Sequence, residues 1–196
     1  MIQHLRPAIV MTVLFTLLLG LAYPLAITGI AGVAFPNQAS GSLLHDTSGK
    51  VVIGSSLIAQ GFSKPQYLHP RASAAGNGYD PMSSGGTNLG PLDQKLIDRV
   101  KGDAATLAKE APGVTIPADA VTTSGSGLDP DVSPENARLQ APRVAAARGI
   151  EVPIVDALID ANQEGPVLGF IGQPRVNVLA VNQALDARYP VVQPKS

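Results

Sequence analysis

Residues 8–34 form an uncharged apolar run that has no equal elsewhere in this chain of 196 residues. The run reads AIVMTVLFTLLLGLAYPLAITGIAGVA and contains no Asn, Gln or His. A helix needs about 20 apolar residues to cross the hydrocarbon core of a bilayer, about 30 Å thick. In lipid the backbone N–H and C=O groups must bond within the segment, which only a helix allows for a single span. We therefore predict one transmembrane helix over residues 8–34, interrupted locally at Pro24.

A cleaved signal peptide is the alternative interpretation of this segment. Arg6 supplies a short positive start, and Gly32-Val33-Ala34 ends in the small residues that a signal peptidase accepts. The apolar part of a signal peptide is about 7–15 residues long. The greater length of this run favours an uncleaved membrane anchor.

The positive charges predict the orientation of the span. Arg6 precedes it, and the first Lys or Arg after it is Lys50. The positive-inside rule then places residues 1–7 in the cytoplasm and residues 35–196 on the periplasmic or extracellular side of the inner membrane.

Composition limits what the part after the span can do. Residues 35–196 are enough for one domain with its own core. The formal net charge of −1 and the absence of Trp argue against a nucleic-acid or base-stacking surface. The chain has no Cys, and its three His residues, His4, His45 and His69, lie far apart, so no metal site is expected.

Apolar periodicity and turn residues predict a single α/β or α+β domain of short helices around a small sheet. Loops are expected at 35–49, where Pro36 ends the membrane helix, and at 61–90. One strand or a pair of short strands is expected within 50–60, a strand at 167–171, and a strand or a helical turn within 114–123. Helices are expected at 91–111, from Ser133 to a break at Pro142, from there to Arg148 before a Gly149 cap, at 153–163 and at 177–188.

Two of these helices carry specific expectations. Pro91 suits the first position of a helix and Asp93 its first turn, and an apolar stripe of helical spacing follows. In the last two helices seven residues are expected in the core: Ile154, Val155, Leu158, Ile159, Val178, Val181 and Leu185.

No set of residues predicts catalysis. The chain lacks a G-x-S-x-G sequence. We interpret His69 as structural, because sequence alone shows no partner for a general base. Asp129 and Asp131 flank Pro130 in a glycine-rich loop, where such residues usually hold a turn.

The segment Ser84-Gly85-Gly86 is the most suggestive for binding. Glycines and hydroxyls before a helix can present backbone N–H groups to a phosphate, and the segment loosely resembles the LSGGQ signature loop of ABC ATPases. No Walker A sequence accompanies it, so a tight turn with positive φ at Gly85 or Gly86 is the alternative.

Six stretches carry a resemblance to a known family. They are RP (6–7), GSSLIAQGF (54–62), YLHPRASAAGNGYDP (67–81), SSGGTNLGP (83–91), TTSGSGLDPDVSPENARLQAPRVAAAR (122–148) and IGQPRVNVLAVNQALD (171–186). With them the chain resembles the C subunit of the Kdp potassium-transporting ATPase, the KdpC family.

The resemblance implies a non-catalytic accessory subunit of an ATP-driven potassium uptake complex. Its implied partners are a channel-like potassium-binding subunit, an ATP-hydrolysing P-type subunit and a small single-span subunit, all within membrane lipid. Members are described as assembly factors and as catalytic chaperones that raise the ATP affinity of the hydrolysing subunit. That second role would fall on Ser84, Gly85 and Gly86, with ATP bound only together with the hydrolysing subunit and potassium as the transported ion.

The predicted topology conflicts with the chaperone role, because it puts this loop on the side without ATP. We therefore expect the Ser-Gly-Gly segment to serve packing or partner contact. In the span, Gly20, Gly29 and Gly32 offer small surfaces on which a partner helix can pack closely. The alternative function is an anchored or secreted extracytoplasmic binding domain unrelated to potassium.

Overall fold

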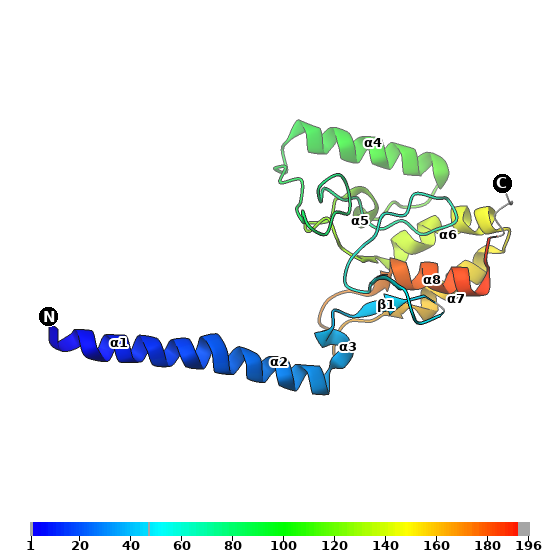
Figure 1. Cartoon of the computed structure of the whole chain (residues 1–196). Coiled ribbons are helices and arrows are strands. Elements are labelled where there is room, and N and C mark those ends of the chain that lie inside the picture. The colour runs from blue at the N-terminus through cyan, green and yellow to red at the C-terminus, as the bar shows by residue number, and fades with distance from the viewer. Residues whose placement is uncertain (1, 47, 192–196) are drawn as a thin grey trace. The chain divides into compact units, whose positions relative to one another are not determined.

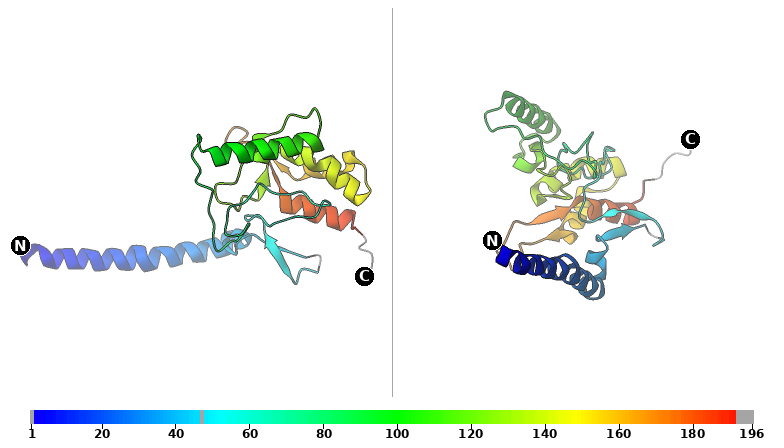
Figure 2. Two further views of the ribbon diagram at one scale, coloured as in Figure 1. Left: turned by 90° about the horizontal axis from the view of Figure 1, so that it is seen from above. Right: turned by 60° about the vertical axis from the view of Figure 1, so that its left-hand side comes forward.

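A computed structural model describes residues 2–46 and 48–191 of the chain. It divides into two compact units, residues 1–44 and 45–196. The first unit holds the helical segment drawn in blue in Figure 1, and the second holds most of the remaining elements (Figures 1 and 2).

The first unit is dominated by a continuous helical rod. It consists of α1 (Ile2–Leu17), a π-helical stretch η1 (Leu18–Ala22) and α2 (Tyr23–Ala34). The stretch Gln3–Ala34 is long and apolar enough to span a membrane, and none of its apolar window is buried. The helical backbone thus begins before the predicted lipid segment, with Pro7 inside it.

The interruption expected at Pro24 takes the form of the π-helical stretch just before it. Proline has no N–H, so Pro24 cannot donate to the carbonyl of Gly20. Here the N–H of Tyr23 donates to the carbonyl of Leu18, five residues back. The widened turn takes up the proline without breaking the rod.

The segment after the rod is more ordered than the loop we predicted. α2 ends at Ala34, as the proline at position 36 predicted. Pro36 is also the first residue of a short helix, α3 (Pro36–Ala39), which we did not predict. β1 (Leu43–His45) and β2 (Val52–Ser55) then form a two-stranded sheet. The strand expected within 50–60 is β2.

In the second unit three helices and a three-stranded sheet make the core. The helices are α6 (Pro134–Arg148), α7 (Val152–Ala161) and α8 (Val178–Arg188). The sheet consists of β3 (Asp131–Val132), β5 (Arg175–Asn177) and β4 (Gln163–Glu164), with β5 in the centre. Both pairings are antiparallel, with Val132 opposite Val176 and Glu164 opposite Arg175.

Six of the seven core residues predicted from periodicity are confirmed. Val155, Leu158, Ile159, Val178, Val181 and Leu185 are buried, whereas Ile154 is only half-buried. The six buried residues share one cluster with the inner face of α6, whose buried residues include Ala137, Ala141, Val144 and Ala145.

The break expected at Pro142 was wrong, because α6 continues through it to Arg148. Pro142 removes one helical hydrogen bond. Since Ala141 and Val144 on either side of it are completely buried, core packing offsets that loss. The other expectations for this helix hold: Ser133 caps its start, and Gly149 ends it at φ +67°.

The helix predicted at 91–111 begins later. α4 (Gln94–Glu110) starts after Asp93, whose carboxylate accepts a hydrogen bond from the N–H of Lys95 at 2.8 Å. An N-cap residue is extended, so the helix cannot include Pro91. Leu92, which lies within the predicted helix and would begin its apolar stripe, is 90% exposed. α4 lies at the outer edge of the unit and has no buried residue (Figures 1 and 2).

Two further predictions concern short elements. The stretch 114–123 contains one turn of helix, α5 (Ala118–Val121). The strand predicted at 167–171 was wrong: Val167 and Ile171 form an isolated bridge that closes a tight turn. The predicted loop at 61–90 has no helix or strand.

Candidate functional site

The Ser-Gly-Gly segment lies along a second glycine-serine segment, residues 124–127. The N–H of Gly85 and the hydroxyl of Ser84 both donate to the carbonyl of Ser126, each at 2.9 Å. Gly86 passes so close that a Cβ added to it would lie 2.9 Å from the carbonyl oxygen of Gly125. The segment is extended, not the tight turn we expected.

A third segment, residues 72–75, holds the second one from the other side. Ser124 is 2% exposed, and its N–H donates to the carbonyl of Ala72 at 3.0 Å. The hydroxyl of Ser73 donates to the carbonyl of Gly127 at 2.6 Å. We call residues 72–75, 84–86 and 124–127 together the Ser-Gly cluster.

Glycine is required in this cluster for reasons other than those predicted. Neither Gly85 nor Gly86 has a positive φ, so that expectation was wrong; the left-handed residue nearby is Asn88, at φ +53°. Gly86 needs a hydrogen in place of a side chain because a backbone carbonyl faces it. Gly127 requires glycine for two reasons: its φ is +69°, and an added Cβ would lie only 2.7 Å from the backbone nitrogen of Ala75.

The cluster presents few groups to an anion. The N–H of Gly85 and the hydroxyl of Ser84 are already paired, and carbonyl oxygens of Gly125 and Ser126 face the segment. The N-terminus of α4 lies seven residues beyond Gly86, and the carboxylate of Asp93 occupies it. A phosphate would meet oxygen atoms at both places.

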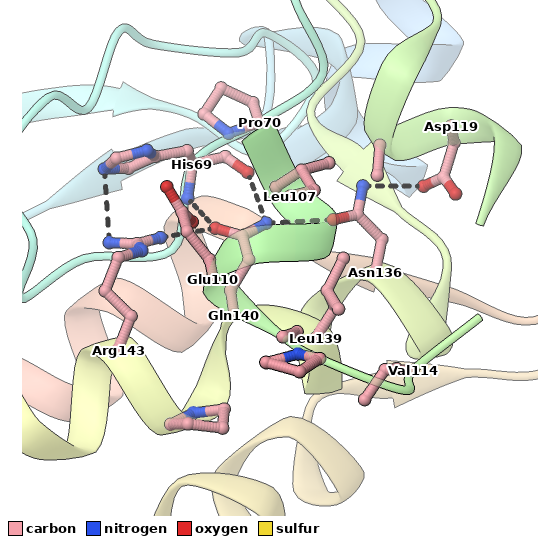
Figure 3. A pocket seen from close by; sticks show the side chains of 14 residues that line it. His69, Pro70, Leu107, Glu110, Val114, Asp119, Asn136, Leu139, Gln140 and Arg143 are labelled. Atoms are coloured by element: carbon pink, nitrogen blue, oxygen red, sulfur yellow. Dashed lines mark hydrogen bonds between the residues drawn. The ribbon is translucent and has the colours of Figure 1, made fainter. Parts of the chain in front are cut away.

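A cavity with a volume of about 550 Å³ lies between α4, α5 and α6. Figure 3 shows Gln140 bonded to His69, Asn136 and Arg143 at one side of it. Gln140 accepts from the N–H of His69 at 2.8 Å and donates to the carbonyl of His69 at 3.0 Å. These bonds join the chain at His69 to α6.

His69 is built into this network as a structural residue, as predicted. Its Nε2 lies 3.1 Å from the carbonyl oxygen of Lys64. Burial, aided by the charge of Arg143, lowers the pKa of His69, against the opposing effects of Lys64 O and Glu110. The neutral ring can donate to the carbonyl of Lys64 through Nε2. Within the described part of the chain the neighbours of Nε2 are this carbonyl and the guanidinium of Arg143, and neither is a nucleophile.

Asp129 holds a turn as predicted and has a partner that sequence reasoning missed, whereas Asp131 lies in β3 and pairs with Arg175 at 3.2 Å. Asp129 accepts from the N–H of Asp131 at 3.1 Å, which is an Asx-type turn. Asp129 also pairs with Arg71 at 3.0 Å. Arg71 is 58 residues away along the chain, so no local pattern could have predicted the pair.

Within residues 2–46 and 48–191 no three His, Asp or Glu side chains come together as metal ligands.

The glycines of the span have free space beside them: a Cβ on Gly29 or Gly32 would meet nothing within 4 Å, and one on Gly20 only Thr16 at 4.0 Å. Gly20 lies in η1, whereas Gly29 and Gly32 lie in α2.

One candidate span followed by one mixed helix-and-sheet unit defines the class: a domain carried on a single membrane helix. The family model for the K+-transporting ATPase, c chain, matches residues 5–187. The chain belongs to this family.

Curated relatives agree over almost their whole length. The potassium-transporting ATPase KdpC subunit of Caulobacter vibrioides (strain NA1000 / CB15N) is 68% identical over 190 residues, 97% of this chain and 96% of the relative. Those of Beijerinckia indica and Koribacter versatilis are 56% and 50% identical, over 99% and 98% of this chain and 98% and 99% of their own. The alternative of an unrelated binding domain is not favoured.

Proposed function

We propose that this chain is the accessory, non-catalytic subunit of a potassium-transporting ATPase complex. The family match over residues 5–187 carries this proposal, because it includes the span as well as the domain. The relatives are named as subunits of a potassium-transporting ATPase. The proposed partners are the potassium-binding, the ATP-hydrolysing and the small single-span subunits of such a complex.

The proposed location is the inner membrane, with the domain on the outer side. Arg6 flanks the span on one side, and no Lys or Arg follows until Lys50. Positive residues stay in the cytoplasm. This orientation supports a role in assembly and stabilisation of the complex from outside.

We further propose that the Ser-Gly cluster is a packing element and that no nucleotide binds to Ser84, Gly85 and Gly86. One set of contacts and one consequence of the proposed orientation support this. The donors of Ser84 and Gly85 are paired with Ser126, and a carbonyl oxygen faces Gly86. ATP would also have to reach the outer side of the membrane.

Two measurements on the assembled complex test these proposals. Pull-down of the full chain from mild detergent should recover the transport and ATP-hydrolysing subunits; recovery of this chain alone would contradict the subunit role. Ser84→Ala should leave the apparent KM for ATP of the complex unchanged, because its hydroxyl bonds only to Ser126 O.

The matched control for the second measurement is Ser83→Ala, one residue earlier and likewise exposed. A several-fold rise in the KM for ATP for Ser84→Ala but not for Ser83→Ala, with assembly intact, would restore the nucleotide role.

A further inference from the structure

The end of α4 lies over the cavity between α4, α5 and α6 and leaves it incompletely filled. Leu107 lines this cavity from α4, and Leu139 and Pro142 line it from α6. Leu107 and Leu139 are only half-buried, and Val114, which lines the same cavity, is 53% exposed. Apolar side chains of two helices therefore remain in contact with water, and bringing the helices together would bury them.

The two halves of α4 are held differently. In the first half the guanidinium of Arg99 donates to the hydroxyl of Thr123, and the Nε of Arg99 is buried. In the second half, among the residues that the structure describes, no side chain of residues 101–110 bonds to another element. The chain after α4 turns at Gly113, which has φ +79° and open space beside it. The second half of α4 can therefore move while the contact of Arg99 stays.

Opposite charges lie across the cavity without forming an ion pair. Figure 3 shows Glu110 of α4 on the side of the cavity where His69 and Arg143 lie. Within residues 2–46 and 48–191 the carboxylate of Glu110 has no hydrogen bond and no ion pair. Burial lowers the pKa of His69 and of Arg143, and the charge of Glu110 opposes both shifts. Glu110 is thus near enough to attract Arg143 but is not in contact with it.

Arg143 is fixed in place and retains donors for a carboxylate. Its guanidinium donates to the carbonyls of Pro65 and Tyr67, at 2.7 and 3.0 Å, and to the side-chain oxygen of Gln140 at 2.8 Å. A guanidinium has five N–H donors, so these three bonds do not use all of them. Since Arg143 is already ordered, an ion pair with it would cost conformational entropy mainly at Glu110.

A small-molecule ligand explains the cavity less well than closure does. Ligand pockets orient their ligand with a few polar groups that point into the pocket. Here the polar side chains of the wall bond to one another. Gln140 bonds to His69 and Asn136, and Asn136 bonds to Asp119. These groups hold the wall together and leave few donors or acceptors for a ligand.

We propose that α4 is a lid that pivots about Arg99 and closes the cavity, with Leu107 packed against Leu139 and Glu110 paired with Arg143. The structure shows the open state. Because no residue of α4 is fully buried, the lid can open and close without unfolding the core. The inference does not depend on the proposed function, since all the residues involved lie in one unit of this chain.

Distances between two spin labels test the lid in the full chain, reconstituted in lipid nanodiscs. The natural chain has no cysteine, so Lys109→Cys on α4 and Ala146→Cys on α6 place one label on each helix at exposed positions. We expect two distance populations, of which the shorter is the closed state. A reference pair of Lys101→Cys and Ala146→Cys has its α4 label near the pivot, so its distance should change much less.

Glu110→Gln, made in the labelled pair, tests the ion pair. It should lower the ratio of short to long distances about two- to fivefold, as expected for the loss of an exposed ion pair. Raising the ionic strength should lower the ratio in the labelled parent in the same way and should have little effect in Glu110→Gln. Asp103→Asn is the matched control, because it also replaces an exposed carboxylate of α4 by an amide and should leave the ratio unchanged.

Leu107→Ala tests the apolar contact and should also lower the ratio. Its control is Leu92→Ala, since Leu92 is 90% exposed and precedes α4. A single distance in the labelled parent that neither Glu110→Gln nor Leu107→Ala changes would overturn the lid. Equal effects of Glu110→Gln and Asp103→Asn would overturn the pairing with Arg143, because the response would then reflect the charge of the helix as a whole.

Discussion

At the scale of single residues, a few buried polar side chains hold the long segment 61–90 to the helices. Asn182 of α8 is 1% exposed and bonds both the N–H and the carbonyl of Leu68, at 2.8 and 2.9 Å. Arg148 donates to the carbonyl of Gln66 at 2.8 Å. These bonds satisfy backbone groups that a buried segment without secondary structure would leave unpaired, and Leu68 can be completely buried as a result.

Gly86→Ala should destabilise the domain, whereas Gly85→Ala should not. The new Cβ of Gly86→Ala would lie 2.9 Å from a backbone carbonyl oxygen, and overpacking of this kind costs about 1–3 kcal/mol. A Cβ on Gly85 meets nothing within 4 Å. Chemical unfolding of the full chain in detergent measures both, and equal midpoints for the two variants would contradict the packing argument.

At the scale of elements, the start of α6 depends on Asp119, which precedes it by more than ten residues. Asp119 accepts hydrogen bonds from the N–H and the hydroxyl of Ser133, each at 2.8 Å, and from the amide of Asn136 at 3.0 Å. Burial acts to raise its pKa, but these bonds outweigh burial and lower the pKa from 3.8. The carboxylate thus reinforces the N-cap that Ser133 provides.

Asp119→Asn should destabilise the domain at neutral pH by about 1–3 kcal/mol, because the amide cannot accept all these bonds. The pKa of Asp119 is lower in the folded than in the unfolded chain. Its contribution is therefore complete above about pH 4 and is lost as pH falls through the folded-state pKa. The loss of unfolding free energy relative to the wild type should be larger at pH 7 than at pH 3.

The control for this prediction is Asp103→Asn, an exposed acid on α4. It should have little effect at either pH. A difference for Asp119→Asn that stays the same at pH 3 and pH 7 would mean that the bonds do not depend on ionisation.

In the span, Gly29→Leu and Gly32→Leu should weaken association with the transport subunits and leave the soluble unit folded. Both glycines have open space beside them, in which a partner helix can approach closely. Ala31→Leu adds similar bulk on another face of the helix, about 100° from Gly32. Recovery of the complex measures the effect, and equal recovery for all three variants would count against packing through the glycines.

Elements with strong apolar periodicity could be predicted from the sequence, and their exact ends could not. α7 and α8 follow from residues such as Leu158 and Val181, which recur at helical spacing and are buried. The start of α4 depends on whether Pro91 begins the helix or Asp93 caps it. The continuity of α6 depends on whether Pro142 breaks the helix or core packing holds it together. Core packing holds α6 together, and the residues that pack against it are not visible in a single segment of sequence.

At the scale of the whole molecule, the sequence predicts the division into a span and a domain far better than it predicts the site. The apolar run at 8–34 needs no tertiary information. The partners of Ser84 and Gly85, by contrast, lie about 40 residues away in sequence, at Ser126. Residues 167–171 were interpreted as a strand because they are apolar. Their side chains are exposed, and exposure depends on the complete fold and not on the local sequence.

The orientation can be measured with single cysteines, since the natural chain has none. Met82→Cys, at a position that is 92% exposed, should react with a membrane-impermeant maleimide in spheroplasts, whose inner membrane is intact. His4→Cys should react only after permeabilisation. The reverse pattern would place the domain in the cytoplasm, and a mature protein that begins at Phe35 would replace the anchor by a cleaved signal peptide.

The position of α8 after the other core elements in the sequence also affects biosynthesis. Val178, Val181 and Leu185 close the core, and Asn182 binds Leu68 across 114 residues. The ribosome makes α8 after α6, α7 and the three-stranded sheet, whereas the apolar helix of residues 2–34 is made before them and is ready to enter the membrane. In the proposed orientation the polypeptide therefore crosses the membrane before its core can close, and the domain folds only after crossing.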